Sequence, residues 1–301
     1  MNNMLNEQTS ELEFLEHLAF SLFQSEQFFD SAICYERIIE LDPSHAKAYY
    51  NLGVVLHDMG QFDYSLLHYE KAKELGYDCS RVNLNIGMHF LKLRDFKNGF
   101  ECVDLQSGGA WRLGQNFDVN KDRLSDIELW EGQNPQGKNI LVYSEQGFGD
   151  NIQFSRYLPE LSRLSGDVTF LCYDALAPVI RNSHTFDDID VLDSINEYVI
   201  DLDYRVPLMS VPRLIETTFD DIPLAEGYFA KTSNKDWGLS SDRMNVAIAW
   251  EATKKDSRRS ISLDLIKNLC DNPKINFINI QRDSEHDIDG VVRVGDRIQD
   301  F

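Results

Sequence analysis

The sequence predicts two fold classes in series: a solenoid of paired α-helices, followed by α/β layers in which strands and helices alternate. A 34-residue period of apolar and small residues in the first third of the chain predicts the solenoid. Short apolar runs that alternate with helical stretches after residue 137 predict the layers. The chain has 301 residues, 43% of them hydrophobic, which is enough for the cores of two or three domains.

A repeated motif defines the solenoid. It occurs as Leu15-x2-Leu18-Ala19-x2-Leu22, as Tyr49-x2-Leu52-Gly53-x2-Leu56 and, more weakly, as Asn83-x2-Ile86-Gly87-x2-Phe90. The second half of each unit recurs with the same 34-residue spacing, as Ser31-x3-Tyr35, Ser65-x3-Tyr69 and Gly99-x3-Val103. This pattern resembles the tetratricopeptide repeat, in which two amphipathic helices per unit bury their apolar faces by stacking. We predict about three repeats within residues 12–106, and a first domain that spans residues 1–115.

Small and aromatic residues have separate tasks in these repeats. Gly53 and Gly87 let paired helices approach closely, while Tyr35 and Tyr69 fill the gap between units. A generic helical bundle is the alternative, which three copies in register disfavour. A repeat stack presents a concave surface that commonly binds a protein or peptide, or it braces the domain that follows; both interpretations stay open.

The second predicted domain, residues 116–235, is a Rossmann-like layer. Its strands are expected at Lys138–Ser144, Asp167–Tyr173, Ile189–Leu192 and Tyr204–Met209, with helices up to Leu164 and over Ala175–Asn182. Strands that alternate with helices favour an open parallel sheet with crossover connections. Such sheets bind ligands at the carboxyl ends of their strands.

A polar linker, Lys231–Arg243, leads to a third predicted domain of residues 244–301. Strands are expected at Asn245–Trp250 and Ile275–Ile280, with a helix at Leu263–Cys270 between them. So few elements can hardly cover both faces of a parallel sheet. We therefore interpret this domain as an incomplete second Rossmann-like layer, with a cleft between the two layers.

Composition excludes several classes of protein. A formal charge of −21 and a pI near 4.6 disfavour nucleic acid and anionic membrane surfaces as partners. The N-terminus lacks the pattern of a signal peptide, and no run of 18 apolar residues predicts a membrane span. The five cysteines are scattered, without a zinc-binding pattern, so we expect reduced thiols, no metal site and a cytoplasmic location.

A loop between the first strand and helix of the second domain carries the first candidate site: Gln146, Gly147, Gly149 and Asp150. The two glycines favour a tight turn and close approach of a ligand. The loop lacks the third glycine of a dinucleotide fingerprint, and Asp150 would repel a pyrophosphate. Asp150 fits a base that accepts a proton from a hydroxyl group, or an N-cap residue in a capping box with Gln153.

The second candidate site follows the first strand of the third domain. Residues 254–259 place four cations in six positions of an anionic chain, and Arg258 and Arg259 could bind a diphosphate leaving group. A solvated basic loop is the alternative. Ser260 could hydrogen-bond phosphate or cap the helix after it, and Gln281 ends the next strand, facing the same cleft.

Four segments together resemble a known family. They are Trp130–Gly132, Lys138–Tyr157 with its E-Q-G-x-G-D-x-I-Q-F-x-R-Y motif, Val206–Pro212, and Ala249-Trp250 with Asp256–Ser260. They resemble bacterial tetratricopeptide-repeat proteins with a glycosyltransferase-like region of the GT-B fold, similar to O-linked N-acetylglucosamine transferases and lipopolysaccharide heptosyltransferases. The resemblance covers nearly the whole chain, and the motif is specific to this group.

The resemblance implies inverting transfer of a sugar from a nucleotide sugar, with no metal and no further cofactor. Asp150 would be the catalytic base, and Arg259, with Arg258 as its substitute, would contact the diphosphate. Relatives continue with a D-T-x-x-x-H-L-x-x-A-L-G-like segment that holds the donor, whereas this sequence ends at Phe301. We therefore expect a C-terminally truncated chain with little or no transferase activity. The alternative is a repeat-based binding or scaffold protein whose α/β region is not catalytic.

Overall fold

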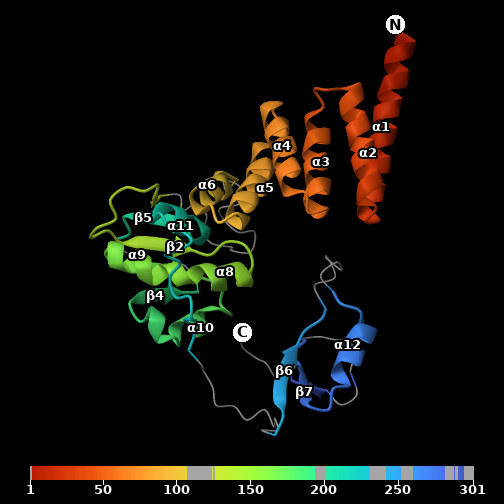
Figure 1. The fold of residues 1–301 in the computed structure, drawn as a ribbon. Coiled ribbons are helices and arrows are strands. Elements are labelled where there is room, and N and C mark those ends of the chain that lie inside the picture. Colours follow the sequence, from red (N-terminus) through yellow and green to blue (C-terminus); the bar gives the residue numbers. More distant parts are fainter. Residues whose placement is uncertain are drawn as a thin grey trace. The chain divides into compact units, whose positions relative to one another are not determined.

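The computed structural model describes residues 2–106, 124, 126–193, 201–230, 242–251, 260–281, 288 and 291–294. The chain forms two compact units, one of residues 1–173 and 185–228, the other of residues 174–184 and 229–301. The first unit contains the helical stack together with the sheet that follows it (Figure 1).

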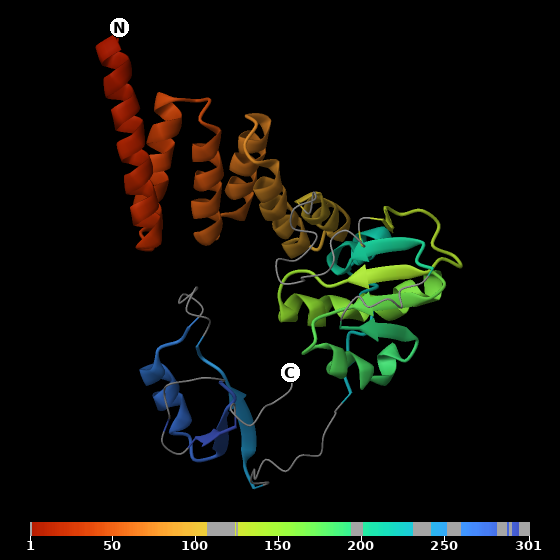
Figure 2. The same cartoon turned by 180° about the vertical axis from the view of Figure 1, so that it is seen from behind.

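The helical stack consists of three antiparallel pairs, as the 34-residue period predicts (Figures 1 and 2). The helices are α1 (Asn2–Gln24), α2 (Phe28–Leu41), α3 (Ala46–Asp58), α4 (Phe62–Glu74), α5 (Cys79–Lys92) and α6 (Phe96–Gln106). Each packs against the next along the chain, both within pairs and from pair to pair. The buried side chains of the stack include Leu52, Tyr69 and Ile86.

The small residues of the repeat lie where the two helices of a pair touch. The hydroxyl of Ser31 donates to the carbonyl of Ala19 at 2.8 Å, and Ser65 donates to Gly53 at 2.7 Å. A Cβ atom on Gly53 would lie 2.7 Å from the ring of Tyr69, so the predicted close approach is confirmed. Tyr69 packs against Gly53 of its own pair and also shares a buried cluster with Val82 and Ile86 of the next pair, so it fills the gap between units as predicted.

The turn inside each pair uses one left-handed residue. Glu26, Gly60 and Arg94 occupy equivalent positions at 34-residue spacing and have φ of 60°, 78° and 65°. A left-handed residue after a helix lets its last carbonyl groups accept hydrogen bonds from the turn. Glycine is found at one of the three turns, which is why the sequence signal for these helix ends is weak.

The second part of this unit is a five-stranded parallel sheet in the order β1-β5-β2-β3-β4. Its strands are β1 (Glu128–Leu129), β2 (Ile140–Tyr143), β3 (Val168–Leu171), β4 (Ile189–Leu192) and β5 (Tyr204–Pro207). All four residues of β2 are buried, as expected for a central strand covered on both faces. The chain proceeds from β2 to β3 and β4, then returns to pair β5 with the other side of β2.

Between β2 and β3 lie three short helices, α8 (Phe148–Phe154), η1 (Ser155–Tyr157) and α9 (Leu158–Leu164). Two more, η3 (Leu208–Ser210) and α11 (Val211–Leu214), follow β5. The expected strands and the helix up to Leu164 are confirmed within a few residues, but Pro159 starts α9 separately from α8. The two-residue edge strand β1 was not expected.

The helical stack and the sheet meet at α6. The ring of Phe96 lies 5.9 Å from that of Phe219, edge to face, and the ring of Phe100 lies 6.3 Å from that of Phe154. The guanidinium of Arg94 lies 4.3 Å from the centre of the Phe219 ring. A pocket of about 480 Å³ lies beside these contacts, between α6 on one side and α11 with the segment after it on the other. The predicted brace is therefore present at this end of the stack.

The second unit contains a three-stranded parallel sheet in the order β6-β7-β8. Its elements are β6 (Met244–Ile248), α12 (Leu263–Cys270), β7 (Ile275–Asn279) and β8 (Val292–Arg293). Two further short elements follow β3 in the chain, α10 (Ala177–Arg181) and η2 (His184–Phe186). The predicted strands and helix of this region are confirmed, and β8 was not expected.

Candidate functional site

A stripe of apolar residues crosses the first helix of every repeat. Phe20, Val54 and Met88 are equivalent positions at 34-residue spacing on α1, α3 and α5. Phe20 is 54% exposed and Met88 is 52% exposed, while Val54 is half-buried. Val54 also packs against the buried cluster that α4 and α5 share, whereas Phe20 and Met88 are mainly exposed. We call these three equivalent positions the A-helix stripe.

Two cations occupy another equivalent position on these helices, Lys47 on α3 and Arg81 on α5. Lys47 pairs with Glu16 of α1 at 2.9 Å, and the same carboxylate lies 3.0 Å from His45. Arg81 is 4.0 Å from Asp78 and its side chain is 68% exposed. Arg81 therefore remains available to an acidic group of a partner, whereas Lys47 mainly joins neighbouring repeats.

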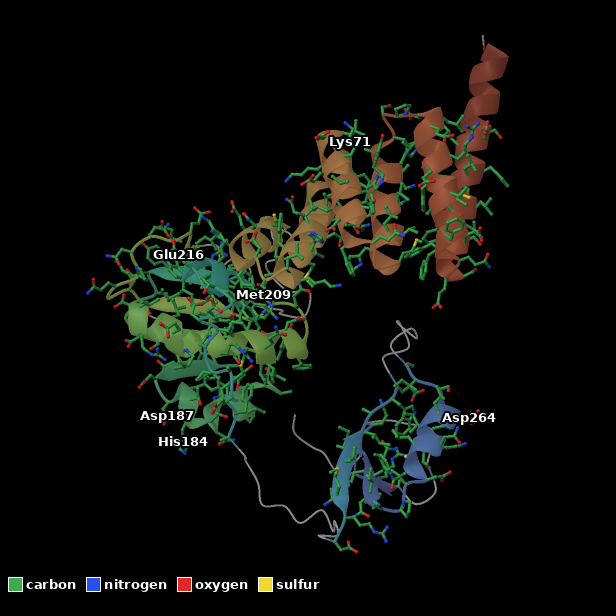
Figure 3. The ribbon with its side chains drawn as sticks, in the orientation of Figure 1. Lys71, His184, Asp187, Met209, Glu216 and Asp264 are labelled. Carbon is green, nitrogen blue, oxygen red and sulfur yellow. The ribbon has the colours of Figure 1, made fainter. Side chains whose placement is uncertain are left out.

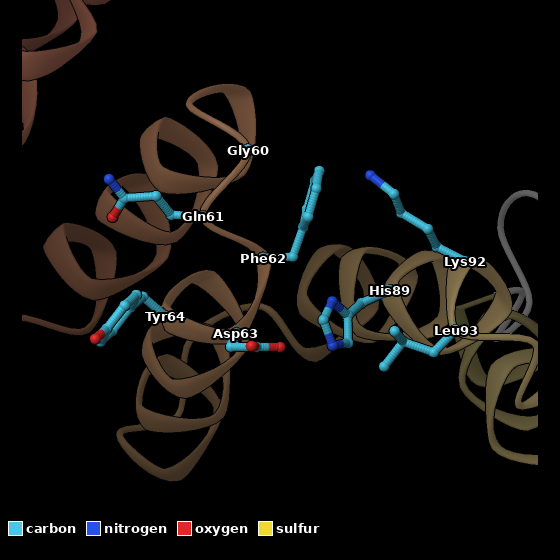
Figure 4. A pocket seen from close by; sticks show the side chains of 8 residues that line it. All are labelled: Gly60, Gln61, Phe62, Asp63, Tyr64, His89, Lys92 and Leu93. Carbon is cyan, nitrogen blue, oxygen red and sulfur yellow. The ribbon is translucent and has the colours of Figure 1, made fainter.

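A pocket of about 460 Å³ opens where α4 begins and α5 ends (Figure 4). The ammonium group of Lys92 lies 3.1 Å from the centre of the Phe62 ring, and Asp63 and the buried His89 line the same pocket. Its lining therefore combines an aromatic face with both signs of charge.

The carboxyl edge of the five-stranded sheet is the second candidate region. The strand order reverses between β2 and β5, and ligands of parallel sheets bind where the order reverses. Glu145, two residues after β2, is 2% exposed, and its Oε1 accepts a hydrogen bond from the backbone N–H of Met209 at 3.0 Å. This carboxylate joins the loop after β2 to the loop after β5. Met209 is labelled in Figure 3.

A strained turn follows Glu145. Gln146 has φ of 60°, a conformation that costs a residue with a side chain about 1–2 kcal/mol. The hydroxyl of Tyr173 donates to the carbonyl of Gln146 at 2.6 Å and holds the turn in place. Burial raises the pKa of Tyr173, and the charges of Asp150 and Glu145 raise it further. Strain of this kind is common where a protein positions functional groups.

Asp150 was predicted as a possible N-cap residue, but it lies inside the first turn of α8. Gly147 is the N-cap residue and Asp150 lies three positions later, where its Oδ2 accepts a hydrogen bond from the N–H of Gly147 at 3.1 Å. The left-handed residue of the turn is Gln146, rather than Gly147 or Gly149, which were expected to permit the turn. Gly147 has φ of −86°, and a Cβ on Gly149 would meet nothing within 4 Å.

The remaining candidate residues belong to the second unit. Arg258 and Arg259 lie outside the described residues. Oε1 of Gln281 accepts hydrogen bonds from the N–H groups of Trp250 and Glu251, at 3.2 and 3.0 Å, so this side chain joins the ends of β6 and β7. Ser262, rather than Ser260, is the N-cap residue of α12. That Asp150 and Arg259 face each other stays a prediction.

Comparison with known proteins identifies the helical stack. The family model described as tetratricopeptide repeat matches residues 34–66, from the middle of α2 into α4. The stack is a tetratricopeptide-repeat region. Protein FlbA of Caulobacter vibrioides (strain ATCC 19089 / CIP 103742 / CB 15) is 25% identical over 167 residues, which are 54% of this chain and 27% of FlbA. The chain thus spans about a quarter of that relative, and the match is longer than the repeat region itself.

Solved structures also resemble part of the chain. The chaperone SycD of Yersinia enterocolitica, in complex with a peptide of the translocator YopD, is 21% identical, with a TM-score of 0.31 over 34% of this chain and 80% of SycD. The N-terminal domain of the stress-induced protein STI-1 of C. elegans is 23% identical, with a TM-score of 0.31 over 33% and 84%. MamA is 23% identical, with a TM-score of 0.31 over 32% and 56%.

Neither the comparisons nor the fold supports the finer part of the sequence interpretation. Tetratricopeptide repeats and parallel sheets are present, whereas none of these comparisons indicates a GT-B glycosyltransferase region or a relationship to O-linked N-acetylglucosamine transferases. Within the described residues, no helix is both long and apolar enough to cross a bilayer.

Sequence reasoning missed two residues of the sheet edge, Glu145 and Tyr173. Each follows the carboxyl end of an observed strand, β2 or β3, where parallel sheets gather functional side chains. That signal was available for both, but Tyr173 was counted as part of a strand and Glu145 as part of a glycine loop.

Proposed function

We propose that this chain is a protein-binding module that recognises a peptide segment of a partner through the A-helix stripe. The stripe carries the proposal, because Phe20 and Met88 are more than half exposed at equivalent positions of a tetratricopeptide-repeat stack. Large apolar side chains on an ordered surface mark interaction sites more often than isolated ones do. Arg81 offers a charge-assisted hydrogen bond to an acidic residue of the same peptide.

A peptide selection tests this function. Peptides from a random displayed library are selected on the purified chain, and their affinities are measured for the wild type and for the Phe20→Ser, Met88→Ser double variant. We expect apolar peptides with an acidic residue, bound at least tenfold more weakly by the variant, because two anchoring contacts are lost. Arg81→Gln should weaken peptides with the acidic residue and leave their neutral versions unchanged.

Leu67→Ser is the matched control for this selection. Leu67 is 61% exposed on α4, outside the stripe, so its loss removes a comparable apolar side chain from another face. Selected peptides that bind the double variant as tightly as the wild type, or that lose affinity equally with Leu67→Ser, would refute the proposal.

Sugar transfer from a nucleotide donor is the second candidate, favoured by one observation: Asp150 lies at the carboxyl edge where the strand order reverses. In this reaction Asp150 accepts the proton of an acceptor hydroxyl, whose oxygen attacks the anomeric carbon with inversion. The bond from that carbon to the diphosphate breaks, the leaving group keeps the electron pair, and Arg258 and Arg259 neutralise it. This second candidate includes the predicted division of the chain into a repeat domain (1–115), a first Rossmann-like domain of GT-B type (116–235) and a partial second one (244–301).

A nucleotide titration tests the second candidate. The melting temperature is measured with increasing UDP or ADP for the wild type and for Arg259→Ala. A rise in melting temperature that occurs in the wild type and disappears in Arg259→Ala supports nucleotide binding at the basic segment. If neither nucleotide raises the melting temperature of the wild type, only the repeat-based function remains as a candidate. Lys274→Ala removes a cation outside that segment and should respond as the wild type does.

We also propose a cytoplasmic location, on the basis of scattered free thiols at Cys34, Cys102 and Cys270. Fractionation of cells that express the tagged chain tests it. Recovery in a membrane or extracellular fraction would contradict the proposal.

A further inference from the structure

The pocket between α4 and α5 gathers polar side chains of several kinds around one space. Residues 60–64, which lead into α4 and form its first turn, make one wall, and His89, Lys92 and Leu93 at the end of α5 make the other. Figure 4 shows the imidazole ring of His89 turned toward Asp63. The volume of about 460 Å³ lies within the range of about 300–1,000 Å³ that is typical of small-molecule sites.

His89 is the most deeply buried polar residue of this pocket. Its side chain is 5% exposed, and within the described residues its ring nitrogens take part in no hydrogen bond or ion pair. Its ring contacts that of Phe90 at 6.1 Å, edge to face. A buried imidazole gives up hydrogen bonds to bulk water and needs others in their place. Because the ring lines the pocket, a bound molecule can supply them.

The two charged side chains of the pocket lack ion-pair partners as well. Among the residues that the structure describes, the carboxylate of Asp63 accepts no hydrogen bond and pairs with no cation. The ammonium group of Lys92 lies 3.1 Å from the centre of the Phe62 ring and, in the same part of the chain, pairs with no carboxylate. The ring of His57 contacts Phe62 edge to face at 5.2 Å, which holds this aromatic wall in place.

The start of α4 adds backbone donors to the same space. Gln61, the N-cap residue, makes no side-chain hydrogen bond to the first turn in the part of the chain that the structure describes. The first N–H groups of a helix have no partner inside it, and they bind carboxylate oxygens well. The residues that carry these groups line the pocket.

The repeat fold does not require these polar side chains. Phe62 recurs at the same position of the other pairs, as Phe28 and Phe96, so the aromatic wall belongs to the repeat. The polar residues do not recur. Between α2 and α3, the positions equivalent to Asp63, His89 and Lys92 are occupied by Phe29, Val55 and Asp58. Val55 is 1% exposed, so this core position accepts a purely apolar side chain.

The mixture of charges selects the class of ligand. A simple anion would meet the carboxylate of Asp63 and the formal charge of −21 of the chain, and a simple cation would meet the ammonium group of Lys92. A molecule that carries one charge of each sign avoids both conflicts. Its ammonium group can pair with Asp63, and its carboxylate can accept from Lys92, His89 and the first turn of α4.

We propose that this pocket binds a free amino acid in its zwitterionic form. Phe62 and Leu93 provide apolar surface for its side chain. The pocket shares no residue with the A-helix stripe, and the proposal does not rest on the function proposed above.

Three probes of nearly equal shape test the proposal on the full chain. They are L-phenylalanine, 3-phenylpropionate, which lacks the ammonium group, and 2-phenylethylamine, which lacks the carboxylate. Isothermal titration calorimetry measures the affinity of each probe. We expect L-phenylalanine to bind at least tenfold more tightly than either of the others, because only the zwitterion satisfies both charges of the pocket.

Variants locate the binding and assign each charge. Asp63→Asn and Lys92→Gln should each weaken L-phenylalanine at least tenfold. Asp63→Asn should tighten 3-phenylpropionate and Lys92→Gln should tighten 2-phenylethylamine, because each change removes the like charge that the probe meets. The matched controls are Asp30→Asn, in the first turn of α2, and Lys73→Gln, in the last turn of α4. Both should bind L-phenylalanine as the wild type does.

His89→Val tests the buried imidazole. The variant places in α5 the residue that α3 has at the equivalent position, so it should remain folded, as its melting temperature will show. L-phenylalanine should bind it at least threefold more weakly. The double variant Phe20→Ser, Met88→Ser of the A-helix stripe should bind L-phenylalanine as the wild type does.

Three results would overturn the proposal: no measurable binding of L-phenylalanine, equal affinity for a probe with one charge, or unchanged affinity in Asp63→Asn and Lys92→Gln. Because the stripe variants lie outside the pocket, failure here together with a successful peptide selection would leave the proposed peptide-binding function intact.

Discussion

Single residues set how closely the helices of a repeat approach. A Cβ on Gly87 would lie 2.8 Å from the carbonyl oxygen of Gly99 and 2.9 Å from the backbone N of Val103. These are backbone atoms, which cannot rotate away as a side chain can. The helical Gly149 has no neighbour within 4 Å of its Cβ position. The same residue type is thus required at one position and replaceable at the other.

We expect Gly87→Ala to lower the free energy of unfolding by about 1–3 kcal/mol, because overpacking outweighs the better helix propensity of alanine. Gly149→Ala is the matched control and should raise the free energy by up to about 1 kcal/mol. Urea denaturation measures both. Equal effects of the two substitutions would show that the close contact does not govern stability.

The Tyr173 hydroxyl reports on the charges of the sheet edge. Because the negative charge of Asp150 contributes to its raised pKa, Asp150→Asn should lower that pKa. Glu160→Gln, on α9, should leave it unchanged. Titration of the chain labelled with 13C-tyrosine, followed by NMR, measures the shift. An unchanged Tyr173 pKa in Asp150→Asn would place the carboxylate too far away to interact.

At the scale of elements, α6 joins the repeat region to the sheet through aromatic contacts. Phe96 and Phe219 come from segments more than one hundred residues apart in sequence, so their contact couples two structural regions. Edge-to-face pairs contribute about 0.5–1.5 kcal/mol beyond burial. This contact therefore helps the first unit unfold as one body.

A double-mutant cycle with Phe96→Ala and Phe219→Ala should give a coupling energy of about 0.5–1.5 kcal/mol. A cycle of Phe96→Ala with Phe29→Ala, on the exposed side of α2, should give none within error. Chemical denaturation of the four chains in each cycle measures the coupling. Additive effects of Phe96→Ala and Phe219→Ala would contradict the contact.

The elements were predictable to different degrees, for physical reasons. The repeats follow from a local period, and strands such as β2 follow from apolar runs. The two-residue strands β1 and β8 carry no such run, since tertiary pairing alone forms them. The place of Asp150 was wrong because the left-handed Gln146 shifts the start of α8, and no sequence rule signals a glutamine there.

The pairing of β5 with β2 depends on residues far apart in the chain, so the exact place of the strand-order reversal was not readable from sequence. The exposure of Phe14 and Leu18 on α1 could not be predicted for another reason. Phe14 and Leu18 fit the same helical period as buried residues, and only the packing of neighbouring helices distinguishes them.

At the scale of the whole molecule, one ion pair beside the sheet makes the stability of the fold depend on pH. Nζ of Lys138 lies 2.7 Å from Oδ1 of Asp203, joining the segments that lead into β2 and β5. The hydrogen bond from Lys138, and another from the N–H of Asn139, lower the pKa of Asp203. The same contact raises the pKa of Lys138.

The sign of the pH dependence follows. The stabilisation by Asp203 is present above its unfolded pKa of about 3.9 and is lost as pH falls through its lower folded pKa. The contribution of Lys138 is present below its unfolded pKa of about 10.4 and is lost as pH rises through its raised folded pKa. Asp203→Asn should therefore lower the melting temperature at pH 7 and have less effect below about pH 3. Asp190→Asn is the control, and an equal loss at all pH values would refute the assignment.

The contact of Phe100 with Phe154 has a mechanical consequence. Phe154 ends α8, a helix of only seven residues whose first turn holds Asp150. Such a short rod transmits a tilt applied at one end to the other. The position of α6 therefore bears on Phe154 and, through the two turns of α8, on the segment that holds Asp150.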